Sequence, residues 1–381
     1  MKKVILTFFA VVAALSLSSC HHNATPEDND NEMFSAIAEQ YIKGTVLPTY
    51  TNLAAQTQNL VDALVAFRAS KTQANLEKAC TYFLDARAWW EKSEAFLFGA
   101  AADFGIDPHI DSWPLDLTAL QNALSNEKQV AAMDDEDGDV YAGEQLGNAV
   151  LGFHGIEYIL FENGAARTAS SISDLNLIYA IAVAGDLRNR TWELEVAWAG
   201  EGAPASHIER VEDDLELNTT LSNGNYYGEN FLSAGKAGSL YASLTAAMDQ
   251  ILAGADDIVV EVGTSKIGKP YSGEDETYIE SPYSQKSITD FYNNIISVQN
   301  AYMGGLEGAR NESASLHKYF SENAPAEDAQ MVAAINEALS KINSMKAPFV
   351  NNMHDTTVKA AIDALDNLDK AIAACQDALE R

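Results

Sequence analysis

Apolar residues recur at intervals of three and four along almost the whole chain, while strict alternation of apolar and polar residues is scarce. Spacing of three and four places side chains on one face of an α-helix, whereas alternation indicates a strand. The pattern is clearest from Val358 to Leu379. A similar one runs from Leu53 to Phe67, after Pro48, which must end or kink any helix before it. Further helices are predicted over residues 33–46, 72–99, 144–162, 173–199, 228–253, 287–305 and 328–346.

Three segments between these helices are long for simple connections and rich in Gly, Pro, Asp and Ser, namely 100–118, 131–141 and 263–286. Loops of that length inside a compact domain usually carry function or lack fixed structure. A looser stretch near residues 200–226 marks the expected domain boundary, and no internal repeat is apparent. The sequence therefore predicts an all-α fold of two helical-bundle domains, each like a four-helix bundle, packed side by side. The two domains are expected to cover residues 33–205 and 206–381.

The N-terminus has the features of an export signal. Lys2 and Lys3 precede an apolar run from Val4 to Leu15 that is too short to span a bilayer comfortably. The run ends in Leu17-Ser18-Ser19-Cys20, which resembles the lipobox of bacterial lipoproteins, where the cysteine thiol carries the lipid. We expect residues 1–19 to be a signal peptide and Cys20 to be lipidated. The alternative is an ordinary secretory signal that ends in a cysteine by chance.

A polar, Pro-containing run follows Cys20, and residues 20–32 are expected to tether the folded part to the lipid. No later stretch reaches the length of a membrane-spanning helix, so membrane contact is expected through the lipid alone. The expected location is the cell envelope, on the outer membrane, facing either the periplasm or the outside. Cys80 and Cys375 lie on apolar helical faces. The sequence is compatible both with a disulfide between them and with two separately buried thiols.

Charge narrows the range of partners. The 381 residues include 24 Lys and Arg against 55 Asp and Glu, a formal net charge of −31. Such an excess of acidic groups argues against binding to nucleic acid, since phosphate backbones are recognised through Lys and Arg. It suits a protein that contacts cations.

Two titratable residues interrupt the apolar stripe of the predicted helix over residues 144–162. His154 and Glu157 share one face of this helix, three residues apart. With 7 histidines and 55 acidic residues in the chain, about one such pair is expected by chance, so the argument rests on its placement. Buried polar groups must be paired or coordinated. Gly152 and Gly155 each cost about 1 kcal/mol of helix propensity, which makes sense if another backbone or a ligand approaches closely.

Another predicted helix carries Arg87, Glu91 and Glu94 within its apolar stripe. One interpretation is an internal ion pair of Arg87 with Glu91 or Glu94 on a solvated edge. The other is that Arg87 orients Glu94 toward a site shared with His154 and Glu157. Carboxylates with one imidazole suit Zn, Mn or Fe rather than Cu(I).

The long loop that follows presents Asp111 and Asp116 on either side of Trp113 and Pro114. Both aspartates are candidate ligands and compete for that role, although Asp116 is as easily the N-cap of the next helix as a ligand. Two look-alike motifs are discounted. In the P-loop-like run from Gly263 to Lys269, Pro270 replaces the Mg²⁺-binding Ser or Thr. In the EF-hand-like run that ends at Glu144, Met133 occupies the first ligand position.

Four motifs together resemble the imelysin-like family of bacterial iron-regulated envelope proteins. The family signature is a Gly-x-His-x-x-Glu motif preceded by a Trp-Glu-x-x-Glu helix, and the matching segments here are Gly152 to Glu157 and Trp90 to Glu94. The segment from Asp111 to Asp116 also matches. The run Ser281-Pro282-Tyr283-Ser284, with Ser287, Asp290, Asn300 and Tyr302 after it, resembles the family's second conserved block. The resemblance spans residues 35–375.

The resemblance implies two bundle-like domains with the motifs near their interface, and a link to iron acquisition. By motif position, the implied metal ligands are Glu94, Asp111, His154 and Glu157. The implied surrounding pocket contains Arg87, Glu91, Trp113, Asp116, Gly152, Ser281, Tyr283 and Ser284. The expected cargo is a divalent or ferric ion, Fe or Zn first, or an iron-containing ligand, and the loop over residues 263–286 with Tyr283 is expected to cover it. Partners in envelope iron transport are expected but not specified.

The same family is also classed with metallopeptidases. A zincin needs His-Glu-x-x-His on one helix, but here residue 155 is Gly and residue 158 is Tyr. A His-x-x-Glu peptidase site would need a distant third histidine, for which His207, His317 and His354 are available. Three hypotheses therefore remain: a metal-binding envelope lipoprotein, a metallopeptidase using His154 and Glu157, and a structural module whose polar groups pair only among themselves.

Overall fold

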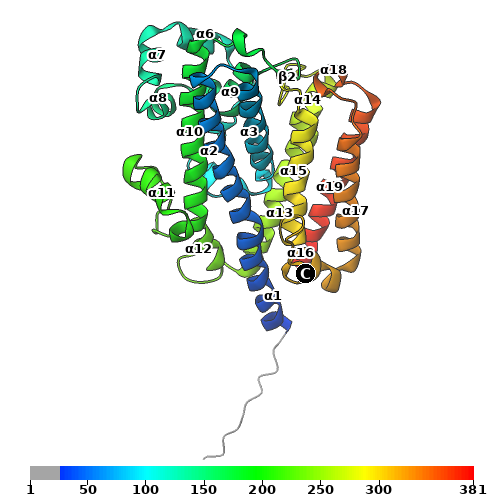
Figure 1. The fold of residues 1–381 in the computed structure, drawn as a ribbon. Helices are drawn as coiled ribbons and strands as arrows, with labels where there is room; N and C mark the ends of the chain where they lie inside the picture. The colour runs from blue at the N-terminus through cyan, green and yellow to red at the C-terminus, as the bar shows by residue number, and fades with distance from the viewer. Residues whose placement is uncertain (1–25) are drawn as a thin grey trace, which may run out of the picture.

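The computed structural model describes residues 26–381, and this part of the chain is almost entirely helical (Figure 1). The all-α prediction is confirmed, because the strands found among the described residues form one short hairpin, β1 (Phe161–Glu162) with β2 (Ala165–Ala166). The predicted signal peptide and Cys20 lie outside the described residues. None of the described helices has the length and apolar character needed to cross a membrane.

The first bundle is built around three long helices. Helix α2 (Leu47–Ala69) packs against α3 (Gln73–Glu91) on one side and α10 (Asp174–Ala199) on the other. Helix α1 (Pro26–Tyr41) runs into α2 through a π-helical turn, Ile42–Val46. Pro48, in the first turn of α2, has no N–H to donate to the carbonyl of Gly44, which accepts from the N–H of Leu306 at 3.1 Å instead. The shorter elements of this half are α4 (Ala100–Asp103), α5 (Ile106–Ile110), α6 (Leu117–Ser125), α7 (Glu127–Met133), α8 (Gly138–Gln145), α9 (Gly152–Leu160), α11 (Ala205–Ile208) and α12 (Tyr227–Leu232).

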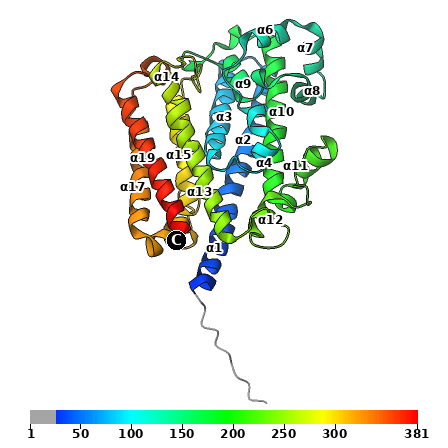
Figure 2. The same cartoon turned by 180° about the vertical axis from the view of Figure 1, so that it is seen from behind.

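The second bundle consists of four long helices that lie beside the first bundle (Figure 2). In it, α17 and α13 pack on α19, and α15 packs on both α13 and α17. These helices are α13 (Leu244–Glu261), α15 (Ser287–Met303), α17 (Pro325–Asn343) and α19 (Thr356–Leu379), joined through α14 (Gly268–Ser272), α16 (Leu316–Asn323) and α18 (Phe349–Asn352).

The two bundles meet along a surface that we call the seam, where α3 and a 3₁₀ turn over Glu94–Phe96 contact α13 and α15. Gly254 permits part of this contact, because a Cβ at this position would lie 2.4 Å from the carbonyl oxygen of Ala95. Buried apolar residues of both bundles form one continuous core. The segment after residue 205 begins with α11, which contacts α10, and α12, which contacts α10 and α1. The domain boundary at 205/206 stays a prediction.

Helix ends differ from the sequence prediction where side chains or glycines end the hydrogen-bond ladder. The helix predicted over residues 72–99 ends at Glu91, since the hydroxyl of Ser93 donates a hydrogen bond to the carbonyl of Trp90 at 2.6 Å. The helix predicted over 144–162 is two helices, α8 and α9, and the one predicted over 228–253 is α12 followed by α13. Helix α1 begins at Pro26, inside the predicted tether.

Candidate metal site between the two bundles

The polar groups singled out from the sequence gather at the seam, where several elements end. The first bundle supplies the end of α3, the 3₁₀ turn, the residue after α5, and α9. The second bundle supplies a π-helical turn, Val262–Lys266, that continues α13, and the loop between α14 and α15. Side chains from both bundles therefore meet in one buried cluster.

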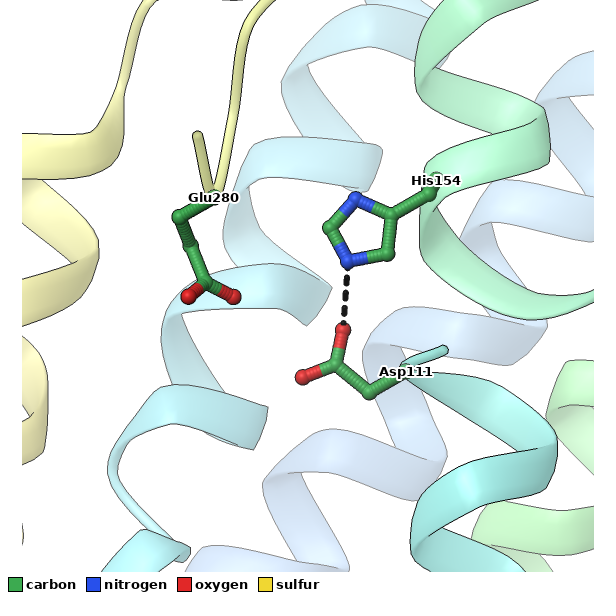
Figure 3. A group of neighbouring side chains, drawn as sticks. All are labelled: Asp111, His154 and Glu280. Carbon is green, nitrogen blue, oxygen red and sulfur yellow. Dashed lines mark ion pairs between the residues drawn. The ribbon is translucent and has the colours of Figure 1, made fainter. Parts of the chain in front are cut away.

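The His154 and Asp111 side chains point toward each other in this cluster, with Glu280 nearby (Figure 3). Nε2 of His154 is 3.0 Å from Oδ1 of Asp111, and both side chains are buried. The two atoms are not aligned for a hydrogen bond, so Nε2 of His154 has no hydrogen-bond partner. The indole N–H of Trp90 donates to Oδ2 of Asp111 at 2.6 Å. Burial opposes ionisation of Asp111, but Arg87 and the contact with His154 outweigh it and lower its pKa. Asp111 is therefore a fixed negative charge.

Gly152 is what allows His154 to reach Asp111. Its φ of +65° is in the left-handed region, and a Cβ there would lie 1.9 Å from the backbone carbonyl oxygen of Ile110. Only glycine fits both the conformation and the contact. Helix α9 can therefore begin directly against the end of α5, with His154 in its first turn next to Asp111.

Arg87 joins three carboxylates from both bundles. Its guanidinium contacts Asp111, Glu91 at 2.6 Å, and Glu280 at 2.5 Å, and all four side chains are buried. Burial opposes the charge on Arg87, but these carboxylates together raise its pKa well above the ordinary value. The expected role of Arg87 in orienting Glu94 is wrong, because Glu94 lies beyond the end of α3 and Arg87 turns to Glu91, Asp111 and Glu280 instead.

Glu94 is paired with a buried lysine. Nζ of Lys266 lies 3.5 Å from Oε1 of Glu94 and 3.2 Å from Oε2 of Glu280. Burial raises the pKa of Glu94, and Lys266 acts in the opposite direction. Lys266 therefore links the first bundle, through Glu94, to the loop that carries Glu280.

Glu157 is held by the loop before α15. Its Oε1 accepts a hydrogen bond from the backbone N–H of Ser284 at 2.7 Å. Its Oε2 is 4.0 Å from Nδ1 of His154 and has no hydrogen-bond partner, although the side chain is buried. Burial raises the pKa of Glu157. One oxygen of this carboxylate is thus buried and unsatisfied, which is uncommon in folded proteins.

Two overlapping groups of side chains have the proximity that a metal ion requires. Asp111, His154 and Glu280 each place a ligand atom within 4.8 Å of the others, and so do Glu91, Glu94 and Asp111. Three of the four ligands predicted from the motifs are among them, and the fourth, Glu157, adjoins His154. One imidazole with carboxylates is a set suited to Fe, Mn or Zn, so the residues fit such an ion.

A cavity of about 210 Å³ leads to the cluster. Its walls include the predicted ligands Glu94 and Asp111, together with Asp107, Glu261 and Lys266. Burial and the charge of Asp111 raise the pKa of Asp107 to about 7. Four of the nine lining residues are acidic and one is basic, a balance that favours the entry of a cation.

The remaining predicted pocket residues are divided between the site and its surroundings. Trp113 is half-buried, with its ring 6.3 Å from that of His154 and 3.7 Å from that of Tyr278 between centroids. The hydroxyl of Ser281 donates to Asp290 at 2.6 Å. Tyr283 packs against Tyr158, with the ring centroids 5.1 Å apart. Asp116 is exposed and caps α6 by accepting from the N–H of Ala119, so its role is structural.

Sequence reasoning missed Glu280, Lys266 and Asn294. The side-chain amide of Asn294 donates a hydrogen bond to Glu91 at 2.5 Å. Glu280 directly precedes the Ser281-Pro282-Tyr283-Ser284 run, so its position beside a recognised motif was a usable signal. The candidate third histidines are engaged elsewhere: His207 with Glu195, His317 with Asp328, and His354 with Glu276. Within residues 26–381, no second histidine joins His154 in a candidate metal group.

Comparison with known families decides the identity of the fold. The family model for imelysin matches residues 46–375, which is most of the chain. The chain belongs to the imelysin family. The resemblance predicted from the Gly152-x-His154-x-x-Glu157 motif is thereby confirmed.

One similar protein and two similar solved structures are consistent with this family. Iron-regulated protein A of Synechococcus elongatus is 28% identical over 349 residues, which cover 91% of this chain and 85% of that protein. A crystal structure described as an iron-regulated protein A precursor from Parabacteroides distasonis has a TM-score of 0.76 and 28% identity, covering 92% of this chain and 95% of its own. An imelysin-like protein from Psychrobacter arcticum, at 12% identity and a TM-score of 0.62, covers 90% of this chain and 93% of its own and shares the fold.

Proposed function

We propose that this protein binds a divalent or ferric metal ion, iron foremost, at the seam between its bundles. The observation that carries the proposal is the convergence of Asp111, His154 and Glu280, whose ligand atoms lie within 4.8 Å of one another although they come from both bundles. Glu94 and Glu157 lie beside them. Iron is preferred because similar proteins are named iron-regulated protein A.

Charge balance supports the proposal. The buried carboxylates at and around the site are Glu91, Glu94, Asp111, Glu157, Glu280 and Asp290. The buried permanent cations are Arg87 and Lys266. Ionised groups taken out of water need opposite charges nearby, and here acidic groups exceed basic ones. Burial accordingly raises the pKa of Glu91 and Glu94, and a metal ion would supply the missing positive charge.

The surrounding groups would hold the ligands in place. Trp90 and Arg87 bind Asp111 from two sides, and the N–H of Ser284 fixes one oxygen of Glu157. Such hydrogen bonds orient metal ligands and keep carboxylates ionised. A resident ion would supply Lewis acidity at this position.

Metal binding to the purified protein tests the proposal. Calorimetric titration with Zn²⁺, Mn²⁺ and, without oxygen, Fe²⁺ should show binding that His154→Ala or Asp111→Asn weakens by at least about tenfold, about 1.4 kcal/mol. His354→Ala is the matched control, because His354 is exposed and lies outside the cluster. Equal binding by wild type and His154→Ala would contradict the proposal.

We also propose that the protein is exported and anchored in the cell envelope through a lipid on Cys20. Support comes from the lipobox-like Leu17-Ser18-Ser19-Cys20, which lies a few residues before α1 begins at Pro26. Metabolic labelling with a fatty acid should mark the wild-type protein and leave Cys20→Ser unlabelled. Equal labelling of both proteins would contradict the anchor.

A further inference from the structure

Lys266 is a buried ammonium group that metal binding alone does not account for. It is 2% exposed and closes the π-helical turn Val262–Lys266 at the end of α13. Its Nζ faces the carboxylates of Glu280 and Glu94, at 3.2 and 3.5 Å. π-Helical turns often mark functional positions. This one directs a positive charge into a group of candidate metal ligands.

An ammonium in this position competes with any metal ion. Glu280 belongs to the group with Asp111 and His154, and Glu94 to the group with Glu91 and Asp111. Lys266 therefore touches one member of each group. A metal ion that bound Glu280 or Glu94 would meet a like charge a few ångströms away, and repulsion at that distance is strong in a buried site.

The structure also offers the ammonium a second position. Lys266 and Glu261 both line the cavity of about 210 Å³ that leads to the cluster. Glu261 is exposed and ends α13. The lysine side chain is flexible, and its charged group can be well solvated in a cavity that holds several waters. Glu261 would give it a new partner there.

We propose that Lys266 determines which cations this site accepts. Its ammonium neutralises Glu94 and Glu280 when no metal is bound, and it moves toward Glu261 when a metal ion takes its place. A monovalent ion brings no more charge than the ammonium and does not displace it, whereas a divalent or trivalent ion does. The inference rests on the metal-binding function proposed above.

Removing the competing charge should strengthen metal binding. In titrations with Zn²⁺ and Mn²⁺, Lys266→Met should bind at least about tenfold more tightly than wild type, since the competing charge no longer has to be displaced. Lys269→Met is the control, because it removes the same charge from a half-buried lysine whose ammonium lies over the ring of Tyr278, 4.3 Å from its centroid, outside both ligand groups. Its binding should stay within about threefold of wild type, about 0.6 kcal/mol. Unchanged or weaker binding by Lys266→Met would overturn the inference.

Amine labelling of the wild-type protein tests the movement without a substitution. Lys266 should resist acetylation by acetic anhydride in metal-free protein, and Zn²⁺ should increase its labelling several-fold by mass spectrometry. Lys43, which is exposed and paired with Glu39 outside both ligand groups, is the internal reference. Equal protection with and without Zn²⁺ would overturn the proposed movement. If wild type shows no His154-dependent metal binding at all, the proposed function itself fails. If wild type binds but Lys266 neither competes nor moves, this inference alone fails.

Discussion

His154 can reach Asp111 because Gly152, two residues earlier in the chain, has no side chain. Gly152 places the start of α9 against the carbonyl of Ile110, and that contact sets the His154–Asp111 distance of 3.0 Å. Arg87 contacts the same Asp111 oxygen as His154, Oδ1, and Trp90 donates to the other oxygen, Oδ2. The site therefore depends on backbone fit as much as on its titratable groups.

Gly152→Ala should destabilise the protein by about 2 kcal/mol or more, because the left-handed φ and the clash with Ile110 both penalise a Cβ. Chemical denaturation measures the loss. Gly147→Ala is the control, since Gly147 has a φ of −80° and nothing within 4 Å of an added Cβ, and it should change stability by less than about 0.5 kcal/mol. Equal effects of the two substitutions would contradict this role of Gly152.

Sequence reasoning singled out site residues that lie within motifs and missed residues that lie between motifs. Glu94, Asp111 and His154 lie in recognisable motifs, and the structure brings their carboxylates and imidazole into adjoining groups. Glu280 pairs with Arg87 from 193 positions away, and no local spacing reports such a contact. Lys266 lies in the run from Gly263 to Lys269 that resembles a P-loop, and sequence reasoning assigned no partner to Lys266.

At the scale of elements, the apolar periodicity predicted helices well and their ends poorly. Apolar periodicity shows which face of a helix is buried. The same spacing of apolar residues can persist across a point where the helix ends, so it does not locate that end. The break after Glu91 arises from the hydroxyl of Ser93, and α8 ends at Gln145 because Leu146 and Gly147 adopt extended backbone. The first break is followed by the turn that carries Glu94, and the second leads into the first turn of α9, which carries His154.

Helices α13 and α19 pack together with one unfavourable pair across them, Asp256 and Asp369. Burial and the neighbouring charge of Asp369 raise the pKa of Asp256 to about 6. Because folding raises the pKa of this carboxyl, the folded protein loses stability as the pH rises from about 4, near the unfolded pKa, to about 6, the folded pKa.

Asp256→Asn should therefore raise the melting temperature at pH 7, and the gain should disappear below about pH 4. Asp256 is only half-buried, so we expect a gain of less than about 1 kcal/mol. Asp366→Asn, on an exposed position of α19, should give no comparable gain. A gain for Asp256→Asn that does not depend on pH would contradict this explanation.

At the scale of the whole molecule, the two bundles share one apolar core and one polar cluster. Asp111 and His154 come from the first bundle and Glu280 from the second, so a ligand bound to all three would tie the bundles together. The all-α fold class was predictable from helix periodicity. The position of the cluster was not, because it depends on how the seam is packed.

Metal should therefore raise the melting temperature of the whole protein in a single transition. Binding to the native state alone adds about 2.7 kcal/mol at a free metal concentration 100 times the Kd. Differential scanning calorimetry with and without Zn²⁺ measures the shift, and His154→Ala should abolish it. An equal shift in His154→Ala, or stabilisation confined to part of the molecule, would contradict a ligand shared by both bundles.

The most direct test of the metal site is anomalous X-ray diffraction from crystals of the wild-type protein soaked in Fe²⁺ or Zn²⁺, recorded at the absorption edge of the metal. The account predicts an anomalous peak within bonding distance of His154 and of at least one of Asp111 and Glu280, and no such peak in His154→Ala crystals. A fully soaked wild-type crystal with no peak at the seam, or with peaks only at surface carboxylates, would contradict it.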